Sequence, residues 1–469
     1  MRRDLSPPPS VNTTPPRQGH LLIIGNGMAA HRLLEALMKA PAGPAWVTVI
    51  GEEASAAYNR IMLSAWLAGD IDRDGLALPS IAASRQAKPS GHGHDDGAPG
   101  TGQGTGTGDG DAPGPHLSHR RGLRVEAIDR QRRLVHCADG EVLAYDHLVI
   151  ATGSRSAMPE VPGIDLEGVG GFRDLADAED LAAGAEPGGQ AVVIGGGLLG
   201  LEAAEGLRRR GMEVTVLQRG PRLMNRQLDT AAADLLAAEL TSRGVSIRTD
   251  AQLAEILGDD RGRVSGVRLV GDDARLPAQR VVIAAGITPN AELGRRAGLD
   301  CDRAIRVDER LTTSDAAISA LGECCQFKDT TYGLVEPIWR QVAVLSAHLT
   351  GQDHAPYRDQ DSATKLKVSG VSLYAFGPTE ADGEHEVLTY HDREQGEYRR
   401  LLLKEGRLEG VVLYGDTRMG PWLFQLASDA TRLDAVRQSL LLGQSDTESL
   451  MAERPFSTDN DATAQEAAA

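Results

Sequence analysis

Two glycine-rich turns are the residues of this sequence best suited to bind a phosphate group. The first reads Gly25-Asn26-Gly27-Met28-Ala29-Ala30, and the second reads Gly195-Gly196-Gly197-Leu198-Leu199-Gly200, 170 residues later. Such a turn between a strand and a helix lets the backbone approach a pyrophosphate at the positive end of the helix. One turn alone is weak evidence, because glycine-rich loops are common. Its repetition predicts two dinucleotide sites in one chain.

The first turn has a residue for each task of such a site. Gly25 permits the turn, Gly27 admits the pyrophosphate, and Ala30 keeps the helix close to the strand. A strand over 47–50 ends shortly before Glu52, whose carboxylate can accept hydrogen bonds from both ribose hydroxyls of an adenosine. We therefore expect these four residues to bind a dinucleotide.

The second turn is followed by a different strand ending. Gly195, Gly197 and Gly200 repeat the pattern, but the strand over 214–217 ends at Gln218-Arg219 and has no acidic residue there. Arg219 could contact the 2′-phosphate of NADPH, or it could be a solvated surface arginine. The choice between NADH and NADPH stays open.

The elements around both turns follow one plan. Short apolar runs alternate with helical periodicity, including a helix over 28–39, as is typical of βαβ units with mostly parallel strands. In each repeat a later predicted strand leads into an Ala-x-Gly run, at 151–153 in the first repeat and at 284–286 in the second. The sequence thus predicts an α/β fold with two Rossmann-like domains. The expected strands are Leu21–Ile24, Val47–Ile50, Leu148–Ile150, Val192–Ile194, Val214–Leu217 and Val281–Ala284.

Composition limits the class of protein. Of the 469 residues, 41% are hydrophobic and 25% charged, a globular balance. A net charge of −17, from 49 Lys and Arg against 66 Asp and Glu, disfavours binding to nucleic acid or an anionic membrane, because phosphates would be repelled. No apolar run is long enough to span a membrane, and the N-terminal residues lack the core of a signal peptide. We expect a cytoplasmic protein.

Three segments are poor in core-forming residues. Residues 91–115 include ten glycines, and the first repeat exceeds the second by about the length of this run. We therefore expect a disordered insertion at about 85–118. The proline-rich residues 1–19 and the acidic residues 445–469 are also expected to be disordered.

We expect no metal site. The expected insertion contains His92, His94 and His116, and His119 follows it. A glycine-rich run holds none of these histidines in place as ligands. The four cysteines form no Cys-x-x-Cys motif, which disfavours zinc and protein-held iron–sulfur clusters.

From about His20 to Gly443 the chain resembles the two-dinucleotide-domain flavoprotein reductases related to glutathione reductase. Within them it is most similar to the FAD/NAD(P)H part of the large subunit of assimilatory nitrite reductase and to the electron-transfer subunit of assimilatory nitrate reductase. The segments that carry the resemblance are Gly25 to Met28 with His31-Arg32, Tyr58 to Ser64, Gly195 to Glu202, Leu223 to Asp229, Leu321 to Cys324, Tyr332 to Val335 and Thr364 to Gly370.

The resemblance implies roles for further residues. It assigns Arg60 to the flavin or its phosphates, places Thr152 and Gly153 in the same site, and lets Glu323 after Gly322 bond the ribityl chain. Glu323 could instead be an acid favoured by a helix N-terminus. For NAD(P)H, the resemblance adds Glu202, near the nicotinamide, and Gly286, and it leaves no certain catalytic residue.

It also implies an architecture. An FAD domain (20–161 and 290–356) is interrupted by an NAD(P)H domain (162–289) and followed by a C-terminal α+β domain (357–444). A homodimer is left open.

The disulfide reductases of this family place cysteines beside the flavin, but the helix expected at Tyr58 to Gly69 has none. Cys324 and Cys325 are adjacent, so a bridge between them would be strained, and we expect buried structural thiols. The cysteine-rich iron–sulfur and sirohaem parts of nitrite reductase do not follow in this sequence. The resemblance therefore implies an FAD-dependent NAD(P)H dehydrogenase that passes electrons to a separate partner. That partner would be a nitrate or nitrite reductase catalytic subunit, or a small iron–sulfur carrier.

Alternatives remain from the same and from another class of protein. A rubredoxin or ferredoxin reductase, or an NAD(P)H oxidase, would use the same two sites. A flavoprotein that senses NAD(P)H and binds partners would need no electron acceptor.

Overall fold

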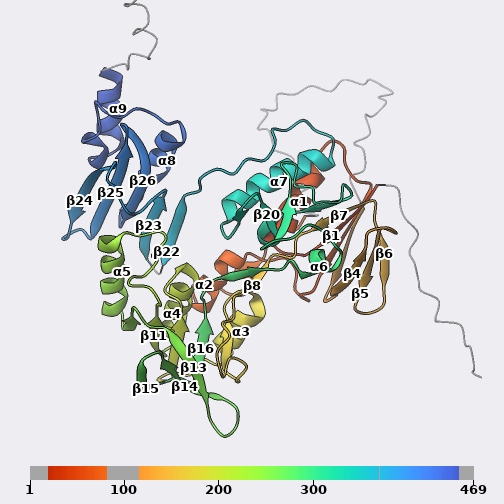
Figure 1. Cartoon of the computed structure of the whole chain (residues 1–469), viewed down its shortest axis with the longest axis horizontal. Coiled ribbons are helices and arrows are strands. Elements are labelled where there is room, and N and C mark those ends of the chain that lie inside the picture. Colours follow the sequence, from red (N-terminus) through yellow and green to blue (C-terminus); the bar gives the residue numbers. More distant parts are fainter. Residues whose placement is uncertain (1–18, 82–115, 369, 454–469) are drawn as a thin grey trace, which may run out of the picture. The chain divides into compact units, whose positions relative to one another are not determined.

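The computed structural model describes residues 19–81, 116–368 and 370–453. The chain divides into two compact units, many of whose elements are labelled in Figure 1. Of the described residues, unit 1 holds 19–63, 71–81, 116–155 and 287–360, and unit 2 holds 64–70, 156–286, 361–368 and 370–453.

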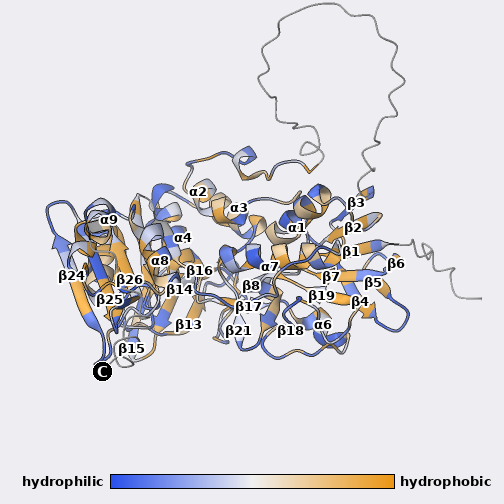
Figure 2. Ribbon diagram, turned by 90° about the horizontal axis from the view of Figure 1, so that it is seen from above, coloured by the Kyte–Doolittle hydropathy of each residue, from blue (hydrophilic) through white to orange (hydrophobic). Residues whose placement is uncertain are grey.

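Unit 1 is built on a parallel sheet with the strand order β19-β7-β1-β2-β3. All five residues of the central strand β1 are buried, as expected for a parallel strand covered on both faces. Figure 2 shows the hydrophobic colour concentrated along such central strands. The strands of this sheet span His20–Ile24 (β1), Trp46–Gly51 (β2), His116–Arg121 (β3), His147–Ile150 (β7) and Ile318–Ala320 (β19).

Helices α1 and α7 pack against each other in this unit (Figure 1). α1 buries Ala30, Leu33, Leu34 and Leu37, a spacing that puts one apolar stripe toward the sheet. The helices are α1 (Met28–Lys39), α6 (Glu292–Arg296) and α7 (Val335–Leu349), with 3-10 turns η1 (Arg60–Met62), η2 (Asp74–Leu76) and η4 (Gly322–Cys324).

Three smaller sheets complete the first unit or lie at its boundary. The order β4-β5-β6 is an antiparallel meander between the third and fourth strands of the main sheet. The other two have the orders β18-β20-β21 and β17-β8. Their strands span Val125–Asp129 (β4), Leu134–Cys137 (β5), Val142–Ala144 (β6), Ser154–Ser156 (β8), Ile287–Pro289 (β17), Ile305–Val307 (β18), Cys325–Phe327 (β20) and Thr330–Thr331 (β21).

Unit 2 repeats the main sheet of unit 1, in the parallel order β12-β11-β10-β16-β9. The meander is repeated as well, because β13-β14-β15 lies between β12 and β16, the counterparts of β3 and β7 in the first sheet. The elements are β9 (Val169–Gly171), α3 (Leu175–Ala183), β10 (Gln190–Ile194), α4 (Leu198–Arg209), β11 (Glu213–Leu217), α5 (Thr230–Ser242), β12 (Val245–Arg248), β13 (Leu253–Gly258), β14 (Val264–Leu269), β15 (Asp272–Pro277) and β16 (Arg280–Ile283). These two sheets confirm the predicted pair of Rossmann-like domains.

The C-terminal part of unit 2 is an antiparallel sheet of order β22-β23-β26-β25-β24 with helices, as predicted for an α+β domain. Its core includes Leu401, Leu413 and Leu423, each fully buried. The elements are β22 (Thr364–Val368), β23 (Val371–Phe376), β24 (Glu386–Asp392), β25 (Glu397–Lys404), β26 (Arg407–Tyr414), α8 (Gly420–Ser428), the 3-10 turn η5 (Ser439–Leu441) and α9 (Gln444–Glu453).

A short helix from early in the chain also belongs to unit 2. Residues 64–70, which include most of α2 (Leu63–Leu67), pack on α4. Leu67 is fully buried, and a Cβ on Gly206 would lie 2.8 Å from its Cγ. Arg210 Nε donates to Leu67 O at 2.7 Å. The glycine in α4 therefore makes room for this helix.

Two expected boundaries are wrong. The segment 445–469 was expected to be disordered, but its first nine residues lie in α9, where Thr447 is buried and Met451 packs on the C-terminal core. The expected insertion at 85–118 overlaps β3, which begins at His116 because this strand pairs along the whole edge of β2. Residues 1–18, 82–115 and 454–469, and with them His92 and His94, lie outside the described residues. Among the described residues, no helix is long and apolar enough to cross a membrane.

Candidate dinucleotide sites

The first glycine turn joins β1 to α1 under tight steric limits. Gly25 has φ +117°, and a Cβ there would lie 2.1 Å from Ala151 O, so only glycine fits. Gly27 is the N-cap of α1 and has no side chain with which to bond the first N–H groups of the helix. These N–H groups can donate hydrogen bonds to a phosphate. Ala30 is buried in the first turn of the helix. The turn has the form predicted for a pyrophosphate cradle.

Arg60 lies at the mouth of this turn. Its Nε would be 4.0 Å from a Cβ on Gly27, and its guanidinium forms an ion pair with Glu53. Glu53 also accepts a hydrogen bond from Tyr58 Oη at 2.8 Å, and Arg60 lies over the Tyr58 ring. The predicted contact of Arg60 with the cofactor phosphates is therefore sterically open, and Glu53 and Tyr58 orient the side chain. Sequence reasoning missed these two residues, although Tyr58 begins a segment that resembles the family.

The predicted flavin-side residues meet around the end of β7. Thr152 Oγ1 donates to Asn290 O at 2.8 Å, and Asn290 Nδ2 donates to Thr152 O at 2.9 Å. Gly153 follows with φ +66° and accepts from the Asn290 N–H. These reciprocal bonds fix the Ala-Thr-Gly run against the chain that returns at Asn290, a residue that sequence reasoning did not single out.

Glu323 lies at the same edge. Its Oε2 accepts from Ser154 Oγ at 2.7 Å, and a Cβ on Gly322 would lie 3.4 Å from Ala29 Cβ in the first turn of α1. The Gly322 N–H donates to Gln341 Oε1, which fixes the turn from α7. The structure thus brings Gly322 and Glu323 to the N-terminus of α1. The contact with Ser154 is a finding of the structure alone.

Glu52 follows β2 as predicted and remains exposed. Its Oε1 lies 3.8 Å from Arg124 Nε, with 73% and 62% of the two side chains exposed. An ion pair so open to water contributes little, so the carboxylate can exchange Arg124 for ribose hydroxyls.

Cys324 and Cys325 are both fully buried, and all four cysteines of the chain are free. Cys324 Sγ lies 3.4 Å from Ile150 O, and Cys325 Sγ lies 3.2 Å from Gly322 O. Burial raises the pKa of both thiols, which disfavours the thiolate needed for redox exchange. Both residues fit the expected structural role.

The second glycine turn reproduces the first. Gly195 has φ +120°, and a Cβ there would lie 2.4 Å from Ala284 O. Gly197 caps α4 without a side-chain bond, and a Cβ on Gly200 would lie 2.0 Å from Gly195 O. The third glycine is therefore required for close packing of α4, as predicted. Gly286, with φ +126°, ends the returning Ala-Ala-Gly run and accepts from the Ala157 N–H.

Gln218 and Arg219 differ in their surroundings. Gln218 Oε1 accepts from the Gly196 N–H at 2.9 Å, so the side chain folds back onto the turn. Arg219 is exposed. The two residues predicted for the adenosine end therefore lie together, with only the arginine open to a ligand.

Glu202 is one turn into α4, where it is shielded from water. Burial raises its pKa to about 7, against a smaller opposing effect of a hydrogen bond from Ser64. Ser64 belongs to the early segment that packs on α4. A carboxyl group with this pKa can exchange a proton near neutral pH. Sequence reasoning singled out Ser64 only as the last residue of the segment that begins at Tyr58.

The segment Leu223 to Asp229 supports the second turn. The Met224 N–H donates to Gly196 O at 2.9 Å, and a Cβ on Gly196 would lie 2.5 Å from Leu223 Cδ2. Asp229 at its end is 3% exposed and accepts from Tyr398 Oη of β25 at 2.7 Å. The C-terminal domain thus contacts the segment that supports the turn.

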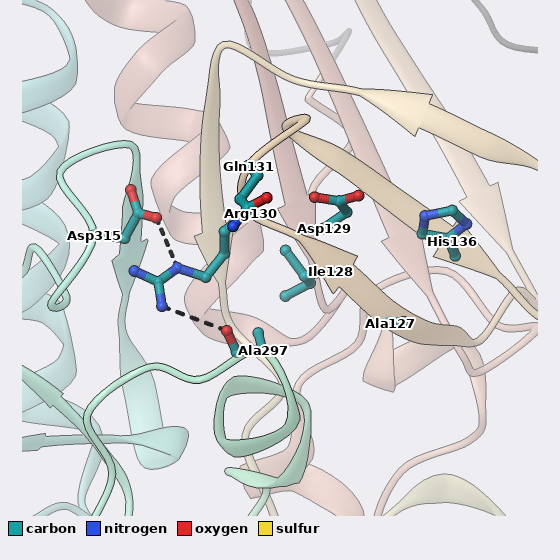
Figure 3. A pocket seen from close by; sticks show the side chains of 8 residues that line it. All are labelled: Ala127, Ile128, Asp129, Arg130, Gln131, His136, Ala297 and Asp315. Carbon is teal, nitrogen blue, oxygen red and sulfur yellow. Dashed lines mark hydrogen bonds and ion pairs between the residues drawn. The ribbon is translucent and has the colours of Figure 1, made fainter.

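A further hollow of unit 1 shares no residue with either turn (Figure 3). It has a volume of about 640 Å³ and lies between the β4–β5 meander and α6. Arg130 in it is already bonded to Asp315 Oδ2 at 2.8 Å and to Gly298 O at 2.7 Å, so its charge is compensated. In the part of the chain that the structure describes, including His116 and His119, no group of three His, Cys, Asp or Glu side chains could hold a metal ion.

Comparison with known families agrees with this geometry. Residues 19–345 match the family described as pyridine nucleotide-disulphide oxidoreductase, and residues 363–429 match the rubredoxin NAD+ reductase C-terminal domain. The chain belongs to the pyridine nucleotide-disulphide oxidoreductase family. As a member it is an FAD-dependent oxidoreductase of NAD(P)H.

Individual relatives confirm the resemblance drawn from the sequence. The chain is 34% identical over 87% of its length to nitrite reductase [NAD(P)H] of Bacillus subtilis, and 33% identical over 86% to the assimilatory nitrate reductase electron transfer subunit of that organism. It spans 47% and 48% of these two proteins, about half of their length. Among solved structures, a ferredoxin reductase from Rhodopseudomonas palustris has a TM-score of 0.70 and 28% identity, over 85% of this chain and 91% of that one.

Both family cofactors fit the residues present. In each turn the first glycine is required because a Cβ there would clash with the backbone of the neighbouring strand, and a glycine N-cap leaves the helix N–H groups without a side-chain partner. These are the requirements of two pyrophosphates.

Proposed function

We propose that this protein takes electrons from NAD(P)H onto FAD and passes them to a separate metal-centred protein in nitrate or nitrite assimilation. The observation that carries the proposal is the duplicated turn, with φ near +120° at Gly25 and at Gly195 on the same strand order. Two intact nucleotide sites are explained by electron transfer between two nucleotides. The similarity to a nitrite reductase and to a nitrate reductase electron transfer subunit supports the pathway.

In this proposal, Gly25, Gly27 and Ala30 hold the FAD pyrophosphate at the start of α1, and Arg60 neutralises part of its charge. Glu52 accepts from the adenosine ribose, and Glu323 accepts from the ribityl chain beside Thr152 and Gly153. FAD, when bound, supplies the chemistry of accepting a hydride and releasing electrons singly.

For the donor, Gly195, Gly197 and Gly200 hold the NAD(P)H pyrophosphate at α4, with Gln218, Arg219 and Gly286 around it. Glu202 orients the nicotinamide, and the Ser64 hydroxyl holds the carboxyl group. These residues contribute to the reaction by positioning NAD(P)H.

In this proposal, the electrons do not leave the flavin through a cysteine thiol. The segment from Tyr58 to Gly69 has no cysteine, and Cys324 and Cys325 are buried with raised pKa values. We propose that the electrons leave directly to the partner's metal centre, a nitrate or nitrite reductase catalytic subunit or a small iron–sulfur carrier. We also propose a cytoplasmic location and the three-domain division drawn from the sequence.

The test is anaerobic rapid mixing of the purified flavoprotein. NADH or NADPH should bleach the visible flavin absorbance, and an assimilatory nitrite or nitrate reductase catalytic protein should restore it within turnover time. A protein that stays colourless after incubation with FAD would refute the proposal.

A second candidate is a rubredoxin or ferredoxin reductase. It is favoured by the match of residues 363–429 to the rubredoxin NAD+ reductase C-terminal domain. Faster reoxidation by a rubredoxin or ferredoxin than by the nitrogen-oxide reductases would select it, and fast reoxidation by oxygen alone would select an NAD(P)H oxidase.

The non-enzymatic alternative, an NAD(P)H sensor, is tested by deletion. The deletion should cover residues 85–115, because β3 begins at His116. Unchanged turnover with loss of partner binding would favour the sensor.

A further inference from the structure

The carboxyl ends of β11 and β12 form one corner of the nicotinamide domain. The two strands are parallel, with Leu217 in register with Arg248, and the Gln218 N–H donates to Arg248 O at 2.8 Å. Gln218, Arg219 and Arg248 therefore lie together beside the turn that begins at Gly195. In such a domain this corner receives the adenosine ribose, where NADPH has a 2′-phosphate and NADH a hydroxyl.

Gln218 takes the place where a carboxylate would select NADH. Its Oε1 already accepts from the Gly196 N–H. The amide is thus committed to the turn and is neutral. It offers the ribose diol no free carboxylate, and it does not repel a phosphate.

Two guanidinium groups are left open at this corner. Arg219 and Arg248 are both exposed, and within residues 19–81, 116–368 and 370–453 neither side chain has a hydrogen bond or ion pair. Nearby Arg222 differs, because it donates to Leu228 O and pairs with Glu380. Two unpaired guanidiniums on adjacent strand ends suit a phosphate, which accepts forked N–H groups.

One acid lies close to the pair. The Asp250 N–H donates to Gly220 O at 3.1 Å, and its side chain is exposed. Against two arginines it leaves the corner with a positive balance. It is also the group that would accept from a ribose hydroxyl if NADH were the donor.

From these observations we propose that Arg219 and Arg248 together bind the 2′-phosphate, which makes NADPH the electron donor of this protein. The inference rests on the proposed function and deepens it, since it names the donor.

The first experiment measures binding without turnover. Calorimetry of the FAD-loaded protein should give tighter binding of adenosine 2′,5′-bisphosphate than of 5′-AMP. Each of Arg219→Ala and Arg248→Ala should weaken bisphosphate binding by about tenfold or more, the effect of a lost charge-assisted contact, and leave 5′-AMP unchanged. Arg261→Ala, an exposed arginine in the β13–β14 turn, is the matched control and should change neither affinity.

The second experiment measures flavin reduction by each nucleotide. The wild-type kcat/KM should be higher for NADPH than for NADH. The double variant Arg219→Ala/Arg248→Ala should lose this preference, because its KM should rise more for NADPH than for NADH. Asp250→Ala should keep the preference for NADPH.

The inference is overturned if the wild type prefers NADH or treats both nucleotides equally, or if the double variant keeps its bisphosphate affinity. Loss of the preference for NADPH in Asp250→Ala would overturn it as well. Those results leave the proposed function standing, because flavin reduction still occurs. Failure of both nucleotides to reduce the flavin would instead reject the proposed function.

Discussion

Burial makes Glu202 a carboxyl group that titrates near neutrality. Its neighbour Glu205, on the same helix, is also buried but shares two hydrogen bonds with Arg208, at 2.8 and 2.7 Å. At Glu202, among the residues that the structure describes, a hydrogen bond from the Ser64 hydroxyl is what offsets the loss of water. The two glutamates therefore differ in their hydrogen-bond partners, because Glu205 pairs with a cationic side chain and Glu202 with a neutral hydroxyl.

We predict that Glu202→Gln stabilises the protein at alkaline pH. The folded pKa of about 7 lies above the ordinary value of 4.5, so the folded state holds the proton more tightly. Stability therefore falls as pH rises between these values, by up to about 3 kcal/mol above pH 7. The variant should have a higher urea midpoint than the wild type at pH 8 and the same midpoint near pH 4.

Glu205→Gln serves as the control for this prediction. It leaves Arg208 without its buried partner and should lower the urea midpoint at pH 8, where Glu202→Gln should raise it. A Glu202→Gln variant that is no more stable than the wild type at pH 8 would contradict the raised pKa.

At the scale of elements, the chain uses one design twice. Each main sheet has the glycine turn on its central strand. Each also carries an antiparallel meander, between β3 and β7 in the first sheet and between β12 and β16 in the second. The turns and central strands could be predicted because φ above zero and buried parallel strands have local sequence signatures. The meanders were missed, since β4 has a single buried residue and β15 has none, so neither strand shows a clear alternation.

We predict that the two turns fail separately. Gly25→Ala should produce a protein without FAD, because the methyl group would meet Ala151 O at 2.1 Å. Gly195→Ala, with a clash of 2.4 Å against Ala284 O, should keep FAD but lose its reduction by NAD(P)H. Flavin content and anaerobic bleaching report the two losses.

Gly271→Ala is the matched control for these variants. Its φ of +75° imposes similar backbone strain, of order 1 kcal/mol, but its Cβ would meet no atom within 4 Å. It should keep both flavin and bleaching. Loss of FAD from Gly195→Ala would show that the second turn is not a separate site.

At the scale of the whole molecule, the C-terminal domain is tied to the nicotinamide domain through buried polar groups. Tyr398 Oη donates to Asp229, Arg400 lies 3.8 Å from the same carboxylate, and Tyr414 Oη donates to Leu235 O. Both domains belong to unit 2. Substitutions in the C-terminal domain should therefore be felt at the segment that supports Gly196.

We predict that Tyr398→Phe destabilises unit 2 by about 1–3 kcal/mol, because Asp229 then stays buried with a lost hydrogen bond. Limited proteolysis between Gly351 and Ala363 should become faster. Tyr390→Phe is the control, since Tyr390 Oη makes only a 3.5 Å contact with Asp392 on β24. Equal rates of proteolysis in the two variants would contradict a stabilising role of the hydrogen bond between Tyr398 and Asp229.

The fold class, the two turns and their order along the chain follow from the amino-acid sequence alone. Each depends on residues close in sequence whose backbone conformation or burial restricts the residue type, as at Gly25 and Gly195. Only the tertiary structure decided which distant groups meet. Ser64 reaches Glu202, Tyr398 reaches Asp229 across 169 residues, and Arg248 comes beside Arg219. These pairs follow from strand register and helix packing, and neither leaves a pattern in the spacing of the residues themselves.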